Sequence, residues 1–349
     1  MMAMTEPGEA GPSVARGYHR SMRRPLRSAG YILLVAAAIG VGWVRLPYFS
    51  FGPGPAREIT PLIQVKDAPT YGSSGHLVMM TIRYDKLTAL GALVTWIDPD
   101  RSVVSEEVVY PPGLPPEEEA QRATSQMDQS KIAAAAVVLS ELTDYPQAHG
   151  PGALVVSVGP DCPADDHLFP GDLIVQVDGE PVDSRREASR LIDAVPIDEP
   201  IEFRVDVDGK MHDVQLTRGT CPGIDEPLVG ILLVASFPFE ITIESAEVGG
   251  PSAGLMWALG LYDLLTPGDL TGGRTIAGTG AIDLDGNIGP IGGIHDKVVA
   301  AQEVDADILL VPQDNLEELR DVDTGDLRLI PVATFDEAVE ALSSQEPAT

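Results

Sequence analysis

Two glycine-rich turns, each followed by apolar helical sequence, constrain the fold of this chain more than any other feature. The first lies in residues 247–264, EVGGPSAGLMWALGLYDL. Gly249 and Gly250 allow a tight turn, Pro251 suits the first turn of a helix, and the apolar residues that follow predict a buried helix. Ser252 is therefore expected at a helix N-terminus, where unpaired backbone N–H groups can stabilise a developing oxyanion.

The second turn lies in residues 289–301, GPIGGIHDKVVAA. It contains Lys297, the only lysine between Cys221 and the C-terminus, at the start of an apolar helix. Burial of an amine lowers its pKa toward neutrality, because low dielectric disfavours the charged form. A neutral amine beside Ser252 could accept the hydroxyl proton and so activate a nucleophile.

His295 is the competing base, since it precedes Lys297 by two residues. Side chains two apart on a helix point in different directions, so at most one of them can face Ser252. With Asp296 or Asp263, the histidine could complete a Ser-His-Asp arrangement.

Both turns, in this order and with the AGTG segment at 277–280 between them, resemble the proteolytic domain of Lon peptidases. The resemblance covers residues 228–342 and implies an α/β domain with a Ser-Lys dyad. By this resemblance Ser252 is the nucleophile, Lys297 the general base, and Thr279 the residue whose hydroxyl helps to hold the lysine.

The turn around the serine, formed by Gly250, Pro251 and Ala253, is expected to support the site, because backbone N–H groups between Gly250 and Ala253 would hold the oxyanion. Two positions depart from the pattern of ATP-dependent members. Gly249 stands where they carry an acidic residue, and Ala281 where they carry a glutamate. The chain contains no G-x-x-x-x-G-K-[ST] motif, so we expect peptidase chemistry without ATP and without any cofactor.

No metal site is expected either. Residues 283–287, DLDGN, contain two aspartates but lack the spacing of a calcium-binding EF-hand loop. An Asp-Gly hairpin turn at Asp285 explains this sequence more simply.

Residues 150–217 predict a second module of short strands and one helix. The segment PGDLIVQVDGEPV resembles the signature of PDZ domains of the bacterial protease type. This resemblance implies a β-sandwich or barrel with helices that binds extended or C-terminal peptides by strand addition. It places a capture loop at 149–153 and the docking edge at 154–158. The peptide-binding candidates are Gly150, Gly152, Ala153, Leu154 and Val156.

Cys162 and Cys221 are the only cysteines, and they flank this module. In an oxidising compartment they could form a disulfide, which sequence alone cannot decide because it gives no Cα separation. Two cysteines are too few for a structural zinc site built from cysteine alone.

An unbroken apolar run at residues 29–44 lies between Arg27 and Arg45. With its flanking residues it approaches the ~20 residues that span a bilayer. The arginines before it predict a cytoplasmic N-terminus and an extracytoplasmic catalytic part, hence a single-pass protein of the cell membrane. A cleaved signal peptide is the alternative, although no Ala-x-Ala site follows the run.

Beyond residue 46 the chain holds 17 basic and 51 acidic residues, so nucleic acid is not an expected partner. The fold class is a multidomain combination of α/β and α+β parts. We assign no chemistry to residues 62–145, in which HLVMMTIRY and ALVTWI suggest strands and 117–142 a helix. The expected division is a basic tail at 1–28, a transmembrane anchor at 29–46, a linker at 47–61, an α+β segment at 62–145, a PDZ domain at 146–220 and a Lon proteolytic domain at 221–349.

The sequence thus predicts a membrane-anchored, ATP-independent serine endopeptidase whose PDZ domain recognises protein or peptide substrates. Because Lon peptidases form rings, the resemblance also implies a homo-hexamer. The main alternative is a catalytically silent, membrane-tethered PDZ adaptor or assembly scaffold, which Gly249 and Ala281 favour. A third hypothesis is a peptidase that cleaves only itself or one dedicated partner.

Overall fold

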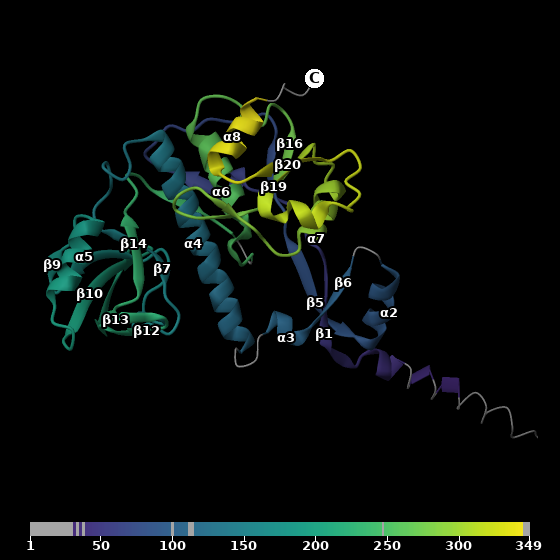
Figure 1. The fold of residues 1–349 in the computed structure, drawn as a ribbon, viewed down its shortest axis with the longest axis horizontal. Coiled ribbons are helices and arrows are strands. Elements are labelled where there is room, and N and C mark those ends of the chain that lie inside the picture. The colour runs from purple at the N-terminus through teal and green to yellow at the C-terminus, as the bar shows by residue number, and fades with distance from the viewer. Residues whose placement is uncertain are drawn as a thin grey trace, which may run out of the picture.

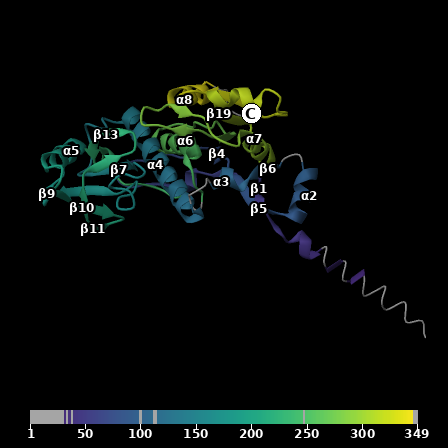
Figure 2. The same ribbon diagram turned by 60° about the horizontal axis from the view of Figure 1, so that its bottom comes forward.

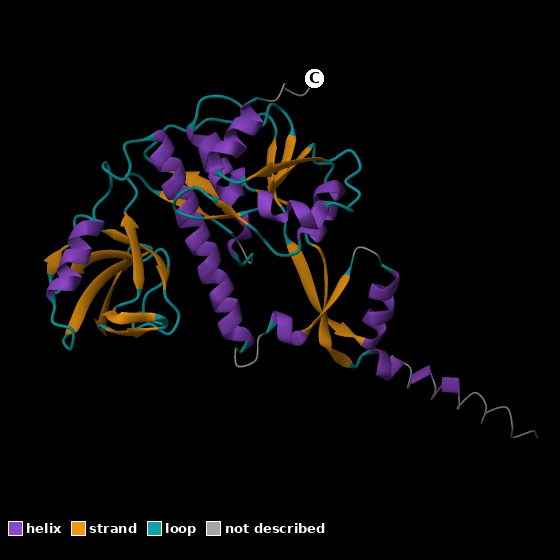
Figure 3. Cartoon of the chain, in the orientation of Figure 1, coloured by secondary structure: helices purple, strands orange, loops and turns teal. Residues whose placement is uncertain are grey.

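The computed structural model describes residues 31–32, 35–36, 39–98, 101–110, 115–245 and 248–344. Figure 1 shows a central α/β unit between two smaller bodies, a sheet module that contains β7 and a lobe that contains α2. In Figure 3 the long helix α4 (Pro116–Leu142) crosses the molecule between them. The helix predicted at 117–142 is therefore present.

The central unit is built on a five-stranded sheet of order β2-β4-β16-β19-β20. Its last four strands are parallel, and β2 pairs antiparallel with β4. The strands are β2 (Arg57–Glu58), β4 (His76–Met79), β16 (Thr275–Gly278), β19 (Ile308–Pro312) and β20 (Arg328–Val332). All five residues of β19 are buried, as expected for a parallel strand that is covered on both faces.

Helices cover both faces of this sheet. Alternate residues along β4 and the residue after it belong to different cores: Leu77 and Met79 pack with α6, whereas Val78 and Met80, which follows the strand, pack with α7. The α6 core is the larger, and α4 closes it from outside. The helices concerned are α6 (Gly254–Leu265), α8 (Phe335–Ser343), α7 (Ile294–Glu303) and η3 (Gln313–Leu319).

The sheet module has the strand order β11-β10-β8-β7-β14, with β9 beside β8. Its elements are β7 (Ala153–Val158), β8 (Leu173–Val177), β9 (Glu180–Pro181), α5 (Arg185–Ala194), β10 (Pro200–Val207), β11 (Lys210–Thr217) and β14 (Ile231–Ala235). Because β14 pairs with β7 along its length, the module extends to residue 235, and the boundary predicted at 220/221 is wrong.

A disulfide joins Cys162 to Cys221, with the two Cα atoms 4.6 Å apart. Cys221 ends β12 (Gly219–Cys221), which pairs with β13 (Ile224–Leu228). The bond therefore ties the loop after β7 to the hairpin that leads into β14, and lies within the module rather than between two domains.

In the lobe, two further predictions from the sequence are wrong, one of a linker and one of a strand. Residues 47–61 are not a linker, because β1 (Arg45–Pro53) lies between β5 (Ile82–Thr88) and β6 (Ser102–Ser105). The sequence ALVTWI is not a strand but most of α2 (Ala89–Ile97), which begins where the Thr88 hydroxyl accepts the Gly91 N–H at 3.0 Å. A short helix, α3 (Glu106–Val109), follows β6.

Residues 62–145 are likewise not one segment. The central sheet takes β4, the lobe takes β5 and α2, and α4 packs on α6. After η1 (Thr60–Leu62), β3 (Ile63–Val65) pairs with β15 (Ile241–Ile243). Such pairings join residues almost 200 apart, as in His76 with Thr275, and no local pattern predicts them.

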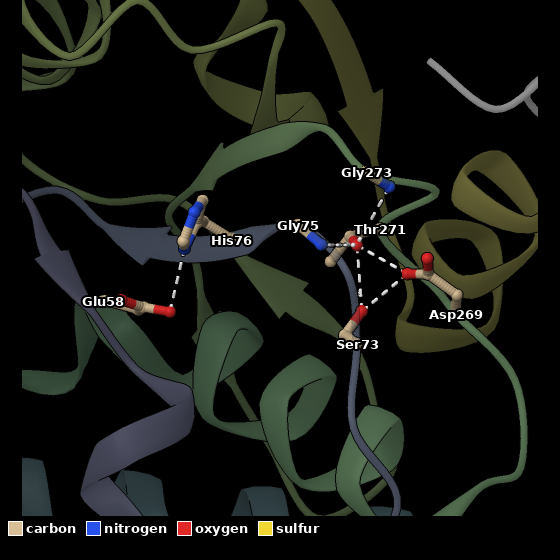
Figure 4. A network of polar contacts seen from close by, with 7 residues as sticks. All are labelled: Glu58, Ser73, Gly75, His76, Asp269, Thr271 and Gly273. Atoms are coloured by element: carbon tan, nitrogen blue, oxygen red, sulfur yellow. Dashed lines mark hydrogen bonds and ion pairs between the residues drawn. The ribbon is translucent and has the colours of Figure 1, made fainter. Parts of the chain in front are cut away.

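A polar network fastens the start of β4 to the loop before β16 (Figure 4). Asp269 accepts hydrogen bonds from the hydroxyls of Ser73 and Thr271, both at 2.6 Å, and from the Gly272 N–H at 2.9 Å. The Ser74 hydroxyl also donates to this carboxylate. The network lies beyond the C-terminal end of α6.

The predicted anchor at 29–46 lies partly outside the described residues. Those of 31–42 that are described are helical and mostly exposed. Within the described ranges, no single helix combines the length and the apolar character that crossing a bilayer requires.

Candidate active site

Ser252 lies in η2 (Pro251–Ala253), the 3₁₀ turn that leads directly into α6. Gly250 precedes the turn with φ +85°, a left-handed conformation that glycine adopts without steric cost. Helix α4 supports the turn from outside, because the buried Ser130 hydroxyl donates to the Pro251 carbonyl at 3.0 Å. The nucleophile candidate is thus held between two helices.

Lys297 lies in the first turn of α7 and is only 2% exposed. Its Nζ is 2.9 Å from the Ser252 Oγ and 2.8 Å from the Thr279 Oγ1. Burial lowers the pKa of Lys297 from 10.5 to about 7. The structure therefore brings together the three side chains expected to form the site, with an amine that is readily neutral near physiological pH.

Thr279 follows β16 and orders the site. Its hydroxyl donates to the Ser252 carbonyl at 3.0 Å, so its oxygen remains available to accept from Lys297. The Gly280 N–H donates to the same carbonyl at 2.8 Å, and the Thr279 N–H donates to the Leu310 carbonyl at 3.1 Å. The nucleophile turn is thereby tied to the central sheet.

The expected oxyanion hole needs a correction. The Gly250 N–H donates to the Ala123 carbonyl of α4 at 2.7 Å, and Pro251 has no N–H. The candidate donor that remains is the backbone N–H of Ser252, because in a 3₁₀ turn the Ala253 N–H faces the Gly250 carbonyl three residues before it.

Helix α4 also accounts for Gly249. A Cβ at this position would lie 2.9 Å from the Ala123 Cβ, so an acidic side chain would require α4 to move. Sequence reasoning missed the contribution of α4, and of Ser130 in particular. A single serine beside the run KIAAAAVV gives no signal that its hydroxyl reaches a turn 121 residues away.

The competing histidine scheme does not assemble. His295 is exposed on α7, and Asp263 is buried toward the far end of α6, where it accepts the Leu270 N–H at 3.1 Å. Asp296 lies in the first turn of α7 and is partly buried. Of the two candidate bases, only Lys297 has a contact with Ser252 within hydrogen-bond distance.

The hairpin between β17 (Ala281–Ile282) and β18 (Ile288–Gly289) contains the acidic sequence of residues 283–287. The Asp283 Oδ1 accepts the N–H groups of Asp285 and Asn287, each at 2.9 Å. The carboxylate thus closes the turn in which it lies.

The predicted peptide-docking edge is wrong. The strand β7 lies between β8 and β14: β14 pairs with it from Ala153 to Val158, and β8 pairs with its first residues, Ala153 and Leu154. Ala153 and Val156 are buried, and Gly152 and Leu154 lie on the same interior strand or at its start. Gly150 instead pairs with the segment after β14, through its N–H to the Ser236 carbonyl at 3.3 Å. The outer strand of the sheet on this side is β14.

Comparison with known proteins identifies both modules. Residues 245–344 match the Lon protease (S16) C-terminal proteolytic domain, and residues 154–206 match the PDZ domain. The Lon protease of Rickettsia bellii is 35% identical over 94 residues, which are 26% of this chain and 12% of the relative. The Lon protease of Vibrio parahaemolyticus is 36% identical over 101 residues, 28% of this chain and 13% of the relative.

Among solved structures, the PDZ domain of an SdrC-like protein from Listeria monocytogenes is 29% identical. The match covers 24% of this chain and 87% of the chain in that structure, with a TM-score of 0.22. The chain spans only about an eighth of the length of the Lon proteases it matches. The chain carries a Lon-type proteolytic domain and a PDZ domain.

Proposed function

We propose that this protein is a membrane-anchored, ATP-independent serine endopeptidase that cleaves flexible or unfolded polypeptides with a Ser252–Lys297 dyad. The observation that carries the proposal is the 2.9 Å separation of the Lys297 Nζ and the Ser252 Oγ. Burial that brings the pKa of this amine to about 7 supplies the neutral base that the chemistry needs.

In the proposed mechanism, neutral Lys297 takes the proton from the Ser252 hydroxyl while Oγ bonds to the scissile carbonyl carbon. The Ser252 N–H stabilises the resulting oxyanion. When the C–N bond breaks, protonated Lys297 gives its proton to the departing amine. Water, deprotonated by the same lysine, then attacks the acyl-enzyme and releases Ser252.

The PDZ module would bind peptide at the free edge of β14. A strand added there would extend the sheet with main-chain hydrogen bonds, and α5 lies close to β14 to help form the groove. The chain runs from β14 through β15 into the Ser252 turn, so peptide capture and the nucleophile lie on one continuous segment.

Three further parts of the proposal rest on the sequence. The apolar run at 29–44, after five arginines, supports one membrane span with an extracytoplasmic catalytic part. The absence of a phosphate-binding loop motif from the sequence supports ATP independence. Assembly as a homo-hexamer follows the ring architecture of Lon peptidases.

The direct test is labelling of the purified full chain with a fluorophosphonate. We expect one covalent adduct, located by peptide mass mapping at Ser252, and no adduct in Ser252→Ala. Labelling should also require Lys297, so Lys297→Met should remain unlabelled while keeping its fold. Failure of the wild-type chain to react, with a serine peptidase of known activity labelled in parallel, would count against the dyad.

The second candidate is a catalytically silent PDZ adaptor or scaffold. The contact between the Gly250 N–H and the Ala123 carbonyl favours it, because one possible oxyanion donor is already occupied. The replacements at Gly249 and Ala281 favour it as well. The labelling experiment separates the two, since a scaffold has no need of a reactive serine.

A further inference from the structure

The helix α2 has the opposite distribution of side chains to a helix that packs on a protein core: a polar residue faces inward and apolar residues face outward. Its Thr95 faces inward, is 6% exposed and donates through its hydroxyl to the Ser50 hydroxyl of β1 at 3.3 Å. Its large apolar side chains face outward, and Trp96 is 84% exposed. The exposed apolar residues of α2, here called the α2 face, are Leu90, Leu93, Val94, Trp96 and Ile97.

The α2 face is continuous with the end of the predicted anchor. The Ala89 N–H donates to the Val44 carbonyl at 3.0 Å, and a Cβ on Gly42 would touch the Leu90 Cβ at 3.4 Å. Trp43 and Val44 are themselves exposed. Both views place α2 beside the N-terminal segment and away from the PDZ module (Figures 1 and 2).

The lobe also differs in charge from the rest of the exported chain. Its segments 45–53 and 82–110 hold four basic and five acidic residues, whereas the remainder of the chain beyond residue 46 has 14 basic and 46 acidic residues. An anionic bilayer surface would repel the latter, but it would not repel the nearly neutral lobe. No charged residue occurs within α2 itself.

We propose that the α2 face lies in the headgroup and acyl-chain boundary of the extracytoplasmic leaflet, as a second membrane contact beside the anchor. The inference rests on the anchoring in the proposed function. If residues 29–46 cross the bilayer, Val44 emerges at the lipid surface, and its hydrogen bond fixes α2 at the same depth. Tryptophan is enriched at that depth, because its ring is apolar and its N–H reaches water.

Lipid is the occupant that the observations favour over a second copy of the chain. The α2 face merges with the exposed Trp43 and Val44 at the exit of the anchor, so its position relative to the bilayer follows from the chain itself. The lobe also contacts α7, the helix that carries Lys297. Insertion of α2 would therefore set how the catalytic unit is oriented above the membrane.

The three tryptophans allow a direct test. The chain contains Trp43 near the anchor exit, Trp96 on the α2 face, and Trp257, which is fully buried in α6. The full chain is reconstituted in phosphatidylcholine vesicles with either ordinary or brominated acyl chains. In Trp43→Phe we expect brominated lipid to remove most of the Trp96 emission, and the aqueous quencher iodide to have little effect on it.

Two controls give this result its meaning. In Trp96→Phe, quenching of Trp43 by brominated lipid reports the anchor independently of α2. In the double variant that lacks Trp43 and Trp96, Met211→Trp places a probe on an exposed position of the PDZ module. We expect iodide, and not brominated lipid, to quench that probe, whereas Trp257 responds to neither.

Three outcomes would overturn the inference. Trp96 quenched by iodide but not by lipid, with Trp43 still quenched by lipid, leaves the anchor intact and places α2 in water. Trp96 shielded from both quenchers shows that protein covers it. If brominated lipid quenches neither Trp43 nor Trp96, the membrane part of the proposed function is wrong, and this inference falls with it. None of these outcomes bears on Ser252 chemistry.

Discussion

Two ionisable groups on either side of α6 have similar hydroxyl neighbours, but the charged form is disfavoured in one and favoured in the other. Lys297 lies between the hydroxyls of Ser252 and Thr279, before the helix, and Asp269 lies between those of Ser73 and Thr271, after it. Burial lowers the pKa of Lys297 to about 7. Partial burial raises the pKa of Asp269, but the hydrogen bonds from its hydroxyl neighbours outweigh that effect and hold this pKa below its usual range.

The two groups differ in their exposure to solvent and in how well their neighbours stabilise the charged form. Asp269 is exposed and accepts from four donors, which all favour its charged form. Lys297 is enclosed, and two neutral hydroxyls cannot replace the water that a charged amine loses. The hydrogen-bonded Asp269 carboxylate fastens two loops together. Among the described residues, burial alone shifts the pKa of the Lys297 amine, which can therefore act as a base.

The largest expected effect is on catalysis at the Lys297 end. Ser252→Ala or Lys297→Met should lower kcat by on the order of a thousandfold or more, because each removes an atom of the proposed reaction. The measurement is hydrolysis of a loosely folded protein by the purified full chain. Ser73→Ala is the matched control: it removes a hydroxyl from the other charged group and should leave kcat unchanged. Full turnover in Lys297→Met would contradict the contrast.

The second prediction is the pH dependence. Since the base must be neutral, kcat/KM should rise about tenfold per pH unit below pH 7 and level off above it. A profile that is flat between pH 5 and about 8 would argue against an amine base.

The same amine should affect stability in a defined direction. Its folded pKa lies below the unfolded value, so between about pH 7 and 10.5 the unfolded chain binds more protons. The free energy of unfolding should therefore rise with pH in that window, by at most about 1.4 kcal/mol per pH unit from this group. Urea unfolding of the wild type and Lys297→Met at several pH values measures it, and equal slopes would contradict the burial.

The sequence was sufficient to propose Ser252 and Lys297 as a pair, because each of them lies in a local motif. Glycines, a helix-starting proline and an isolated lysine are visible without coordinates, and the resemblance to Lon peptidases joined them. Sequence reasoning missed what depends on distant pairing. The strands β4 and β14 join sheets that their neighbours in sequence do not, so the domain boundaries and the peptide edge were misplaced.

The α2 error has a different cause. ALVTWI contains several residues that favour strands, and it folds as a helix that begins at a threonine cap. A helix with an apolar outer face carries no inward pattern by which sequence could recognise it. The exposure of Trp96 becomes informative only when the buried Thr95 is seen behind it.

A fourth prediction concerns the support that α4 gives to the nucleophile. Ser130→Ala should lower kcat by about tenfold and leave KM unchanged, because the Pro251 carbonyl loses its donor and the turn loses its position. The rate of fluorophosphonate labelling should fall in parallel. Ser140→Ala is the matched control on the same helix, since that hydroxyl donates only back to the Ala136 carbonyl at 2.8 Å. Equal effects of the two would mean that α4 is a general stabiliser.

The smallest effect is expected at the Asp269 end. Asp269→Asn should lower the free energy of unfolding at pH 7 by about 1–2 kcal/mol, a figure that allows for solvent screening of an exposed group, and leave kcat unchanged. Because the folded pKa is depressed, this contribution is complete above the unfolded value near 3.8 and fades as the pH falls through the lower folded pKa. Urea unfolding of wild type and variant should thus differ at neutral pH and converge in strong acid. A loss of kcat without loss of stability would show that this carboxylate affects catalysis at the Ser252 end of α6. It would contradict the prediction that the Asp269 end contributes to stability alone.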